Sequence, residues 1–264
     1  MIIVRFIVCV KQVPDTTEVK VDPKTNTLIR EGVPCILNPF DQFALEEAVR
    51  LKKEGDEIIV ISMGPPQAKK ELMKCLALGA DEAILLSDRV LAGADTWATS
   101  YTLAQAIRKI GDFDIIFCGY QAIDGDTAQV GPELAAQLGI PQITYIESVD
   151  ELSSRKLTAK SQTDDGYKIV EVRLPVLLTG ITPSGFIPRS PPLPNIIKAK
   201  QKSFTTWTAD DLGGEKDMYG LAGSLTQVIR VYAPPVREKG VMITDEPIIA
   251  VEKLMEILIK DKVI

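Results

Sequence analysis

The chain has 264 residues, a length that predicts one or two domains. Hydrophobic residues make up 45% of it and charged residues 25%, the balance of an ordinary soluble globular protein. It contains no histidine, and this excludes Ser-His-Asp and Cys-His catalysis together with zinc and iron sites built on imidazole. General acid–base chemistry by Asp, Glu, Lys or Tyr remains open.

Charge and cysteine content further restrict the partners, metal sites and cellular location that we expect for this protein. Thirty basic residues against 36 acidic ones give a net charge of −6, which argues against a nucleic-acid partner. The four cysteines, Cys9, Cys35, Cys75 and Cys118, form no C-x-x-C pair and predict reduced core thiols and no metal site. No apolar run is long enough to span a membrane, and the first ten residues fit a buried strand better than a signal peptide. We therefore expect a cytoplasmic protein.

The first 140 residues alternate predicted strands and helices. Near-continuous apolar runs predict buried strands over 2–10, 57–62, 83–86 and 114–119. Helices are predicted from Pro39 to about Leu51, from Gly64-Pro65-Pro66 to Gly79, over 96–110, and from about Thr127 to Leu138. Residues 11–37 are predicted as a loop. This order indicates an α/β fold, a parallel sheet with helices on both faces.

Ligands bind such sheets outside the carboxyl ends of the strands. Three loops meet that description: Val10–Asp15, Ser62–Pro66 and Gly119–Gly131.

The pattern changes after residue 150. Residues 156–162 and 167–173 predict a β-hairpin, and 176–178 one more core strand. Prolines between 188 and 194 indicate a stiff, extended segment. Periodicity is then weak until a last helix at about 247–260. We predict an α/β domain over 1–197 and an arm over 198–264, which wraps a partner or is disordered.

The strongest candidate site is the loop from Gly119 to Pro132, between a buried strand and a helix. Backbone N–H groups and the helix dipole gather anions at such a place. Asp126 or Thr127 can cap the helix, Gly125 and Gly131 allow close approach, and Thr127 and Gln129 can donate to phosphate oxygens. No Walker loop or G-x-G-x-x-G occurs, so an ordinary β-α turn is the alternative.

Three other segments leave two interpretations each. Asn38-Pro39-Phe40-Asp41 can present an amide to a base or ribose, although the residues alone favour a simple helix start. Lys11 is more often a solvated charge than a ligand contact. Residues 193–202, with exposed Leu and Ile beside lysines, fit a docking peptide or a linker packed back on the domain.

Taken together, these segments resemble the beta subunit of electron transfer flavoproteins. The resemblance is carried by Val-Lys-Gln-Val-Pro-Asp at 10–15 and Asn38-Pro39-Phe40, and by the segments 46–52, 62–65, 77–81, 121–124 and 193–196. It implies a Rossmann-like, adenine nucleotide alpha hydrolase-like domain with a hairpin addition and a C-terminal arm wrapping an FAD-holding alpha subunit. The beta subunit itself then binds AMP or, in electron-bifurcating members, a second FAD.

The resemblance also implies which residues serve each role. The nucleotide site would be lined by Cys9, Asn38, Pro39, Phe40, Asp41, Met63, Asp124, Gly125, Asp126, Thr127, Ala128, Gln129, Val130, Gly131, Pro132, Glu133, Leu134 and Ala135. Docking to an acyl-CoA dehydrogenase would use Leu193, Pro194, Asn195, Ile196, Ile197 and Lys198.

The segments at 10–15 and 124–132 resemble the bifurcating branch. There the subunit, not catalytic alone, belongs to an oxidoreductase complex in which FAD accepts hydride from NADH. One electron then goes to ferredoxin or flavodoxin, and the other passes through the alpha-subunit FAD to the dehydrogenase. The alternatives are an AMP-bearing electron shuttle, an ATP-hydrolysing or adenylylating enzyme, and an interaction subunit whose nucleotide is only structural.

Overall fold

The computed structural model describes residues 3–15, 34–229, 240 and 242–264. The chain divides into two compact units, 1–229 and 230–264. Residues 203–207, which lie beyond the expected boundary at 197/198, form a strand of the main sheet.

The elements follow one another along the chain in the order of their labels. The strands are β1 (Arg5–Cys9), β2 (Gln12–Pro14), β3 (Cys35–Leu37), β4 (Glu57–Met63), β5 (Glu82–Leu86), β6 (Ile115–Gly119), β7 (Gln142–Leu152), β8 (Lys156–Thr163), β9 (Gly166–Arg173), β10 (Val176–Gly180) and β11 (Ser203–Trp207). The helices are α1 (Pro39–Leu51), α2 (Lys69–Leu78), α3 (Thr96–Ile110), α4 (Val130–Leu138), α5 (Leu193–Ala199), α6 (Ala209–Leu212) and α7 (Pro247–Lys260), with short 3₁₀ turns η1 (Pro66–Ala68), η2 (Arg89–Leu91) and η3 (Lys216–Met218).

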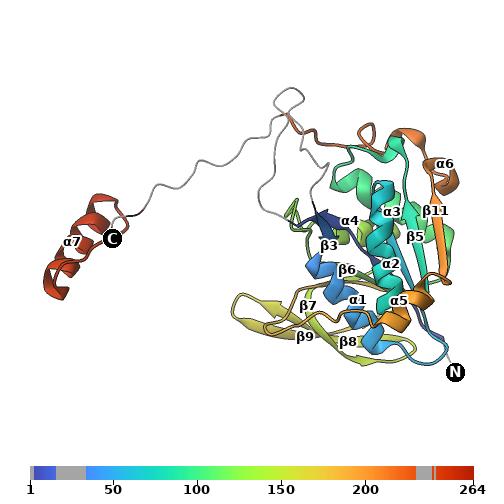
Figure 1. Cartoon of the computed structure of the whole chain (residues 1–264), viewed down its shortest axis with the longest axis horizontal. Coiled ribbons are helices and arrows are strands. Elements are labelled where there is room, and N and C mark those ends of the chain that lie inside the picture. Colours follow the sequence, from blue (N-terminus) through green and yellow to red (C-terminus); the bar gives the residue numbers. More distant parts are fainter. Residues whose placement is uncertain (1–2, 16–33, 230–239, 241) are drawn as a thin grey trace. The chain divides into compact units, whose positions relative to one another are not determined.

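The first unit is built on a nine-stranded sheet in the order β11-β5-β4-β1-β6-β10-β7-β8-β9 (Figure 1). Pairing is parallel from β11 to β7, and β8 and β9 extend the sheet as an antiparallel hairpin. The chain moves from β1 outward to β4 and β5 and then returns to β6 on the other side of β1. This reversal is the point at which α/β sheets bind ligands, and the expected mainly parallel α/β fold is confirmed.

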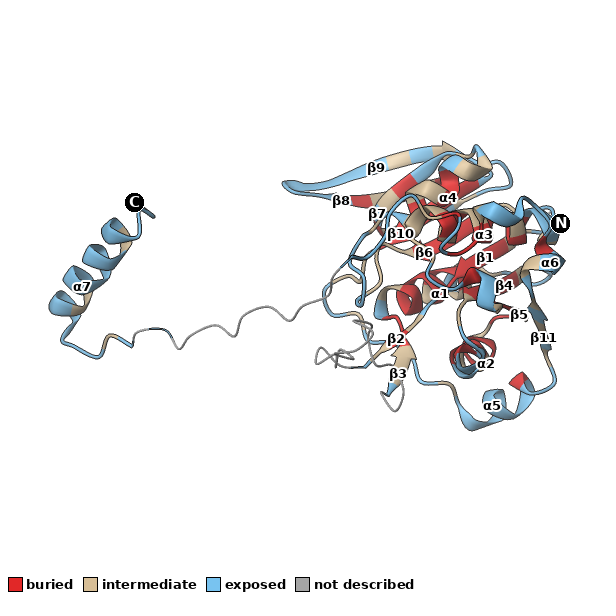
Figure 2. Ribbon diagram, turned by 90° about the horizontal axis from the view of Figure 1, so that it is seen from above, coloured by how far each residue is buried: buried red, intermediate tan, exposed pale blue. Residues whose placement is uncertain are grey.

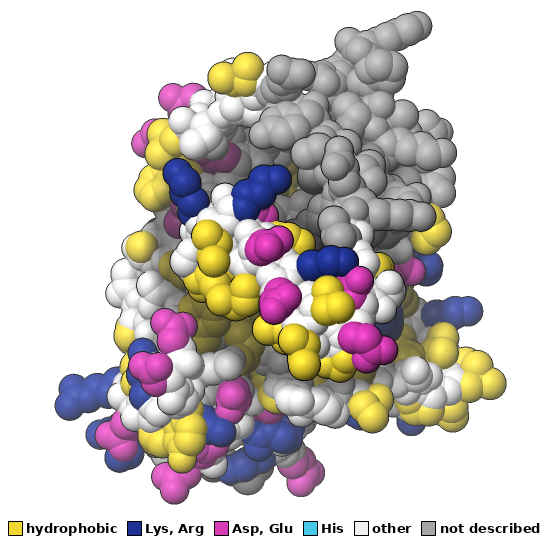
Figure 3. All heavy atoms as spheres, turned by 90° about the vertical axis from the view of Figure 1, so that its left-hand side faces the viewer, with side chains coloured by type: hydrophobic (Ala, Val, Ile, Leu, Met, Phe, Trp, Pro, Cys, Tyr) yellow, Lys and Arg dark blue, Asp and Glu magenta, His cyan; other side chains and the backbone are white. Residues whose placement is uncertain are grey.

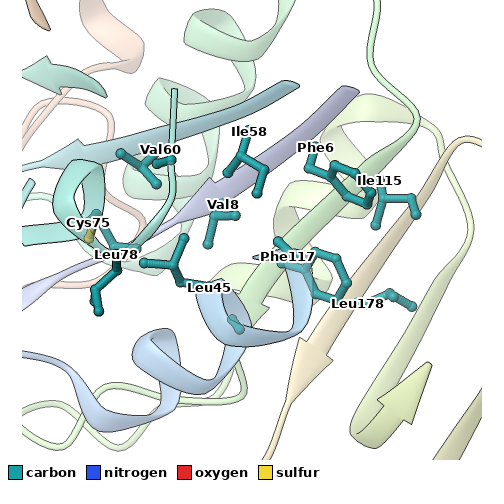
Figure 4. Close-up of a cluster of buried hydrophobic side chains, with 14 of the residues drawn as sticks. Phe6, Val8, Leu45, Ile58, Val60, Cys75, Leu78, Ile115, Phe117 and Leu178 are labelled. Atoms are coloured by element: carbon teal, nitrogen blue, oxygen red, sulfur yellow. The ribbon is translucent and has the colours of Figure 1, made fainter. Parts of the chain in front are cut away.

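Helices cover both faces of the sheet. Successive residues of β1 point to opposite faces, so Phe6 and Val8 pack under α1 and α2, while Ile7 and Cys9 pack under α3 and α4. Figure 2 shows the buried residues gathered in the central strands and the helix faces against them. Figure 4 shows side chains of the hydrophobic cluster on the face covered by α1 and α2. That cluster includes Phe6, Val8, Leu45, Ile58, Val60, Cys75, Leu78, Ile115, Phe117 and Leu178.

Several regions differ from the sequence prediction. Residues 12–14 and 35–37, expected to be loop, form the antiparallel pair β2–β3; the intervening part of that expected loop lies outside the described residues. Strands β7 and β11 were not predicted, and the segment expected to be extended at 193–194 begins α5, because prolines are accepted in a first helical turn.

The surface carries mixed charge. Figure 3 shows basic and acidic side chains interspersed with exposed hydrophobic ones on the face drawn. Within the second unit, α7 leaves apolar side chains such as Ile248, Val251 and Leu254 exposed. In the described part of the chain, no helix has both the length and the apolar character that a membrane span requires.

Candidate functional site

The site is assembled at the carboxyl edge of the sheet, where β4, β1 and β6 are neighbours. The three loops expected there follow these three strands, so the fold brings them to one edge as predicted. The amino end of α1 lies among them and supplies two buried polar side chains, Asn38 and Asp41.

Asp41 joins the residues that follow β1 to the end of β6. Its carboxylate accepts the backbone N–H of Lys11 at 2.7 Å and that of Gly119 at 3.1 Å. The side chain is buried, and burial raises the pKa of Asp41 to about 7, although hydrogen bonds from Asn38, Lys11 and Gly119 act to lower it.

Asn38 fixes the next part of the same loop. Its amide nitrogen donates to the carbonyl of Gln121 at 2.9 Å, and its amide oxygen accepts the N–H of Ile123 at 3.3 Å. Its own N–H donates to the carbonyl of Lys11 at 2.9 Å. Asn38 is the N-cap residue of α1, the helix start that the residues alone favour, and its side chain shapes the loop instead of capping the helix.

Lys11 adds a third connection between the loops. Its ammonium pairs with Asp124 at 2.7 Å, and the Lys11 side chain remains nearly half exposed. The expected solvated lysine is thus a partly exposed ion pair, the kind of contact that contributes little stability but fixes geometry.

The loop beyond Asp124 presents a row of backbone donors. Asp126 and Ala128 have positive φ angles of 49° and 54°, which interrupt helical geometry and delay the start of α4 to Val130. Neither Asp126 nor Thr127 caps the helix, which corrects that expectation. The N–H groups of residues 127–131 form no hydrogen bond with any described residue. Consecutive free N–H groups at the positive end of a helix form an anion-binding arrangement.

Glycines in the site serve different purposes. A Cβ on Gly125 would meet no described atom within 4 Å, so this position is open. A Cβ on Gly131 would lie 2.5 Å from the Thr179 methyl group, so this glycine allows close packing against β10. A Cβ on Gly119 would lie 2.3 Å from the Asp41 carboxylate.

The other predicted site residues take varied positions. Pro39 is exposed, and Phe40 packs edge-on against Tyr120 with ring centroids 4.4 Å apart. Met63 ends β4 half-buried. Gln129 is exposed, and Val130, Pro132 and Glu133 are half-buried. Three side chains are buried in the core between the sheet and the helices α3 and α4: Cys9 of β1, and Leu134 and Ala135 of α4.

Thr96, at the start of α3, was not predicted to belong to the site. Its hydroxyl lies 3.2 Å from Gln129 Oε1 and 3.1 Å from Glu133 Oε1. Burial raises the pKa of Glu133, while the Thr96 hydrogen bond opposes the rise. Its other oxygen, Oε2, is buried without a partner among the described residues. No pattern in the sequence links Thr96 to a loop thirty residues later.

The predicted docking segment lies away from this edge and packs beside α2 as α5 (Figure 1). Leu193 is 69% exposed and Ile197 56% exposed, so the apolar side chains are not packed back on the domain. Two cations flank the helix: Arg189 pairs with Glu46 at 2.5 Å and donates to the Leu78 carbonyl.

The second flanking cation is Lys202. Its ammonium donates to the carbonyls of Leu76 and Ala80, at the end of α2, at 3.0 and 2.5 Å. Partial burial lowers the pKa of Lys202. Both ends of α5 are therefore tied to the same helix end.

The chain is similar in sequence to proteins of known family. Residues 25–212 match the model of the electron transfer flavoprotein domain. The chain belongs to the electron transfer flavoprotein family. It is 52% identical to the electron transfer flavoprotein subunit beta of Clostridium acetobutylicum, over 92% of this chain and 93% of the relative. These matches confirm the resemblance to beta subunits.

Two further relatives come from differently named systems. Subunit CarD of the caffeyl-CoA reductase-Etf complex of Acetobacterium woodii is 51% identical, over 91% of this chain and 92% of that subunit. Protein FixA of Azorhizobium caulinodans is 44% identical, over 90% and 88%. Among the described residues, no group of three or more Cys, Asp or Glu could hold a metal ion.

Proposed function

We propose that this chain binds FAD at the carboxyl edge of its sheet and forms a heterodimer with an electron transfer flavoprotein alpha subunit. In that complex NADH is the electron donor. One electron of each pair goes to ferredoxin or flavodoxin, and the other goes through the alpha-subunit FAD to an acyl-CoA dehydrogenase. The observation that carries the nucleotide site is the row of free N–H groups at residues 127–131.

The residues present fit a dinucleotide phosphate. Thr127 and Gln129 are exposed beside the free N–H groups, and their side chains can donate further hydrogen bonds. Gly125 has open space around it, and Ala128 is small, so the loop leaves room for a group larger than the adenylate. The phosphate would bind without a lysine from a Walker loop, since the chain has none.

The role of the chain is to bind and orient the cofactor. A bound flavin supplies the hydride and single-electron chemistry. Asn38 and Asp41 hold the loops in place from beneath, and Lys11 fixes Asp124 at the rim. No acid–base side chain of this chain is required, in keeping with the absence of histidine.

An AMP-bearing electron shuttle is the second candidate. The same N–H groups would bind the single phosphate of AMP, and several relatives carry the general name of electron transfer flavoprotein beta subunit. The name of the CarD relative places that protein in a complex with a CoA-ester reductase, which favours the first candidate.

Coupled electron transfer tests the proposal. The purified complex is mixed anaerobically with NADH, ferredoxin, the dehydrogenase and an enoyl-CoA acceptor. We expect ferredoxin reduction that stops when the acceptor is omitted. Acceptor reduction with no ferredoxin reduction would favour the AMP-bearing shuttle.

A further inference from the structure

Asp41 is a buried carboxylate whose hydrogen bonds cross the switch point of the sheet. It is 6% exposed, and it receives N–H groups from Lys11 and Gly119. These donors follow β1 and end β6, which are adjacent parallel strands. Asp41 thus bridges the two loops directly through one carboxylate, alongside the connections made by Asn38 and by the Lys11–Asp124 ion pair.

The fit around this carboxylate is close. Gly119 leaves no room for a Cβ, since that atom would lie 2.3 Å from Asp41 Oδ1. Among the described side chains, the Lys11 ammonium is directed to Asp124 and not to Asp41. The carboxylate is therefore held by backbone donors from inside the protein.

We propose that Asp41 is a positioning residue whose ionised carboxylate holds the loops after β1 and β6 at the spacing the nucleotide site requires. The inference rests on the proposed nucleotide site and names a regulation of that same site. The carboxylate acts through the backbone N–H groups of Lys11 and Gly119, and the Asn38 side chain adds a further hydrogen bond to it.

Protonation changes this contact. A carboxylate accepts both N–H groups, whereas a carboxylic acid carries an O–H that opposes one of them. The surrounding groups are the Lys11 ammonium, which favours ionisation, and the thiols of Cys75 and Cys118. With a pKa of about 7, Asp41 passes from about nine-tenths ionised at pH 8 to about one-tenth at pH 6.

Nucleotide retention is then expected to weaken as the pH falls. Glu133 beside the donor row acts in the opposite direction, because its protonation removes a negative charge near the phosphate. A loss of retention between pH 8 and pH 6 therefore cannot come from Glu133.

The contribution of Asp41 to folding stability changes with pH in the direction opposite to nucleotide retention. The folded pKa of Asp41 lies above the unfolded value, so this group favours the folded state less as the pH rises from about 4 to 7.

The matched variants are Asp41→Asn and Asp56→Asn. Asparagine keeps the shape of Asp41 but accepts only one of the two N–H groups and opposes the other with its own NH₂. Asp56 is the control, because its carboxylate also accepts two backbone N–H groups, from Val4 and Lys53 at 2.8 Å each, at the amino edge of the same sheet.

The experiment measures release of FAD and of AMP, each added separately as probe, from the heterodimeric complex at pH 8 and pH 6. At pH 8 we expect Asp41→Asn to release the bound nucleotide about tenfold faster than wild type, and Asp56→Asn to release it at the wild-type rate. Wild-type release of FAD should accelerate severalfold at pH 6, while release of FAD from Asp41→Asn should be independent of pH. Denaturant unfolding of the same proteins should show Asp41→Asn gaining stability relative to wild type as the pH rises from 5.5 to 8.

Wild-type release that does not change with pH would overturn the inference even if Asp41→Asn failed to fold. Equal release from Asp41→Asn and wild type would also overturn it, and both results would leave the proposed nucleotide site intact. A wild-type complex that binds neither FAD nor AMP would remove the proposed function, and this inference with it.

Discussion

The substitution Gly119→Ala tests the closest contact in the site. The added Cβ would lie 2.3 Å from Asp41 Oδ1 and 2.8 Å from both the carbonyl carbon and the Cβ of Phe40. Such distances are shorter than side-chain contacts in proteins, and two of the three atoms cannot turn away because they belong to the start of α1. The helix end and β6 must therefore move apart.

Two contributions lower the free energy of unfolding of Gly119→Ala. Overpacking of this kind costs about 1–3 kcal/mol, and weakening a buried hydrogen bond to a charged group costs about 1.5–3 kcal/mol. A loss of about 3 kcal/mol or more would lower the midpoint of thermal unfolding by roughly 6–12 °C in a protein of this size.

Thermal unfolding of the purified protein measures this loss. The control is Gly125→Ala, whose Cβ meets no described atom within 4 Å, so its midpoint should stay within about 2 °C of wild type. A Gly119→Ala midpoint as close to wild type as that of the control would show that Gly119 and Asp41 are not in close contact.

Three further substitutions test α5, the docking segment and the nucleotide loop. Lys202→Met removes two hydrogen bonds to the end of α2. We therefore expect the free energy of unfolding to fall by about 1–2 kcal/mol and hydrogen exchange in α5 to become faster. Unchanged exchange would show that Lys202 does not hold α5 against α2. Leu193→Ala should slow electron delivery to the dehydrogenase without changing NADH oxidation by the flavoprotein alone, whereas an equal loss in both assays would contradict docking. Thr127→Val should weaken nucleotide retention only a few-fold, because the backbone N–H groups remain; unchanged retention would exclude its hydroxyl from the site.

Sequence patterns predicted the elements whose signals are local. The bounds of α3 agree at both ends because Asp95 caps its first turn and Gly111 ends it with a positive φ. The core strands β4, β5 and β6 also agree closely, since each is a continuous run of buried apolar residues. The exposed edge strand β11 was missed because Ser203–Trp207 alternates without a buried residue.

The site itself could be predicted only as a location. Strand order and the carboxyl-end rule indicate the edge of the sheet at which the three candidate loops meet. The roles of Asn38 and Asp41 depend on contacts with residues about 80 positions later, which no local pattern records. The delayed start of α4 depends on the positive φ angles of Asp126 and Ala128, residues that favour a helix start or interior when only their identity is known.

Cofactor content is the most direct measurement of whether this chain holds FAD. The heterodimeric complex is purified anaerobically and denatured, and the released FAD and AMP are separated and counted per heterodimer. We expect two FAD and no AMP, one FAD being held by the alpha subunit. One FAD and one AMP per heterodimer would show that this chain holds AMP.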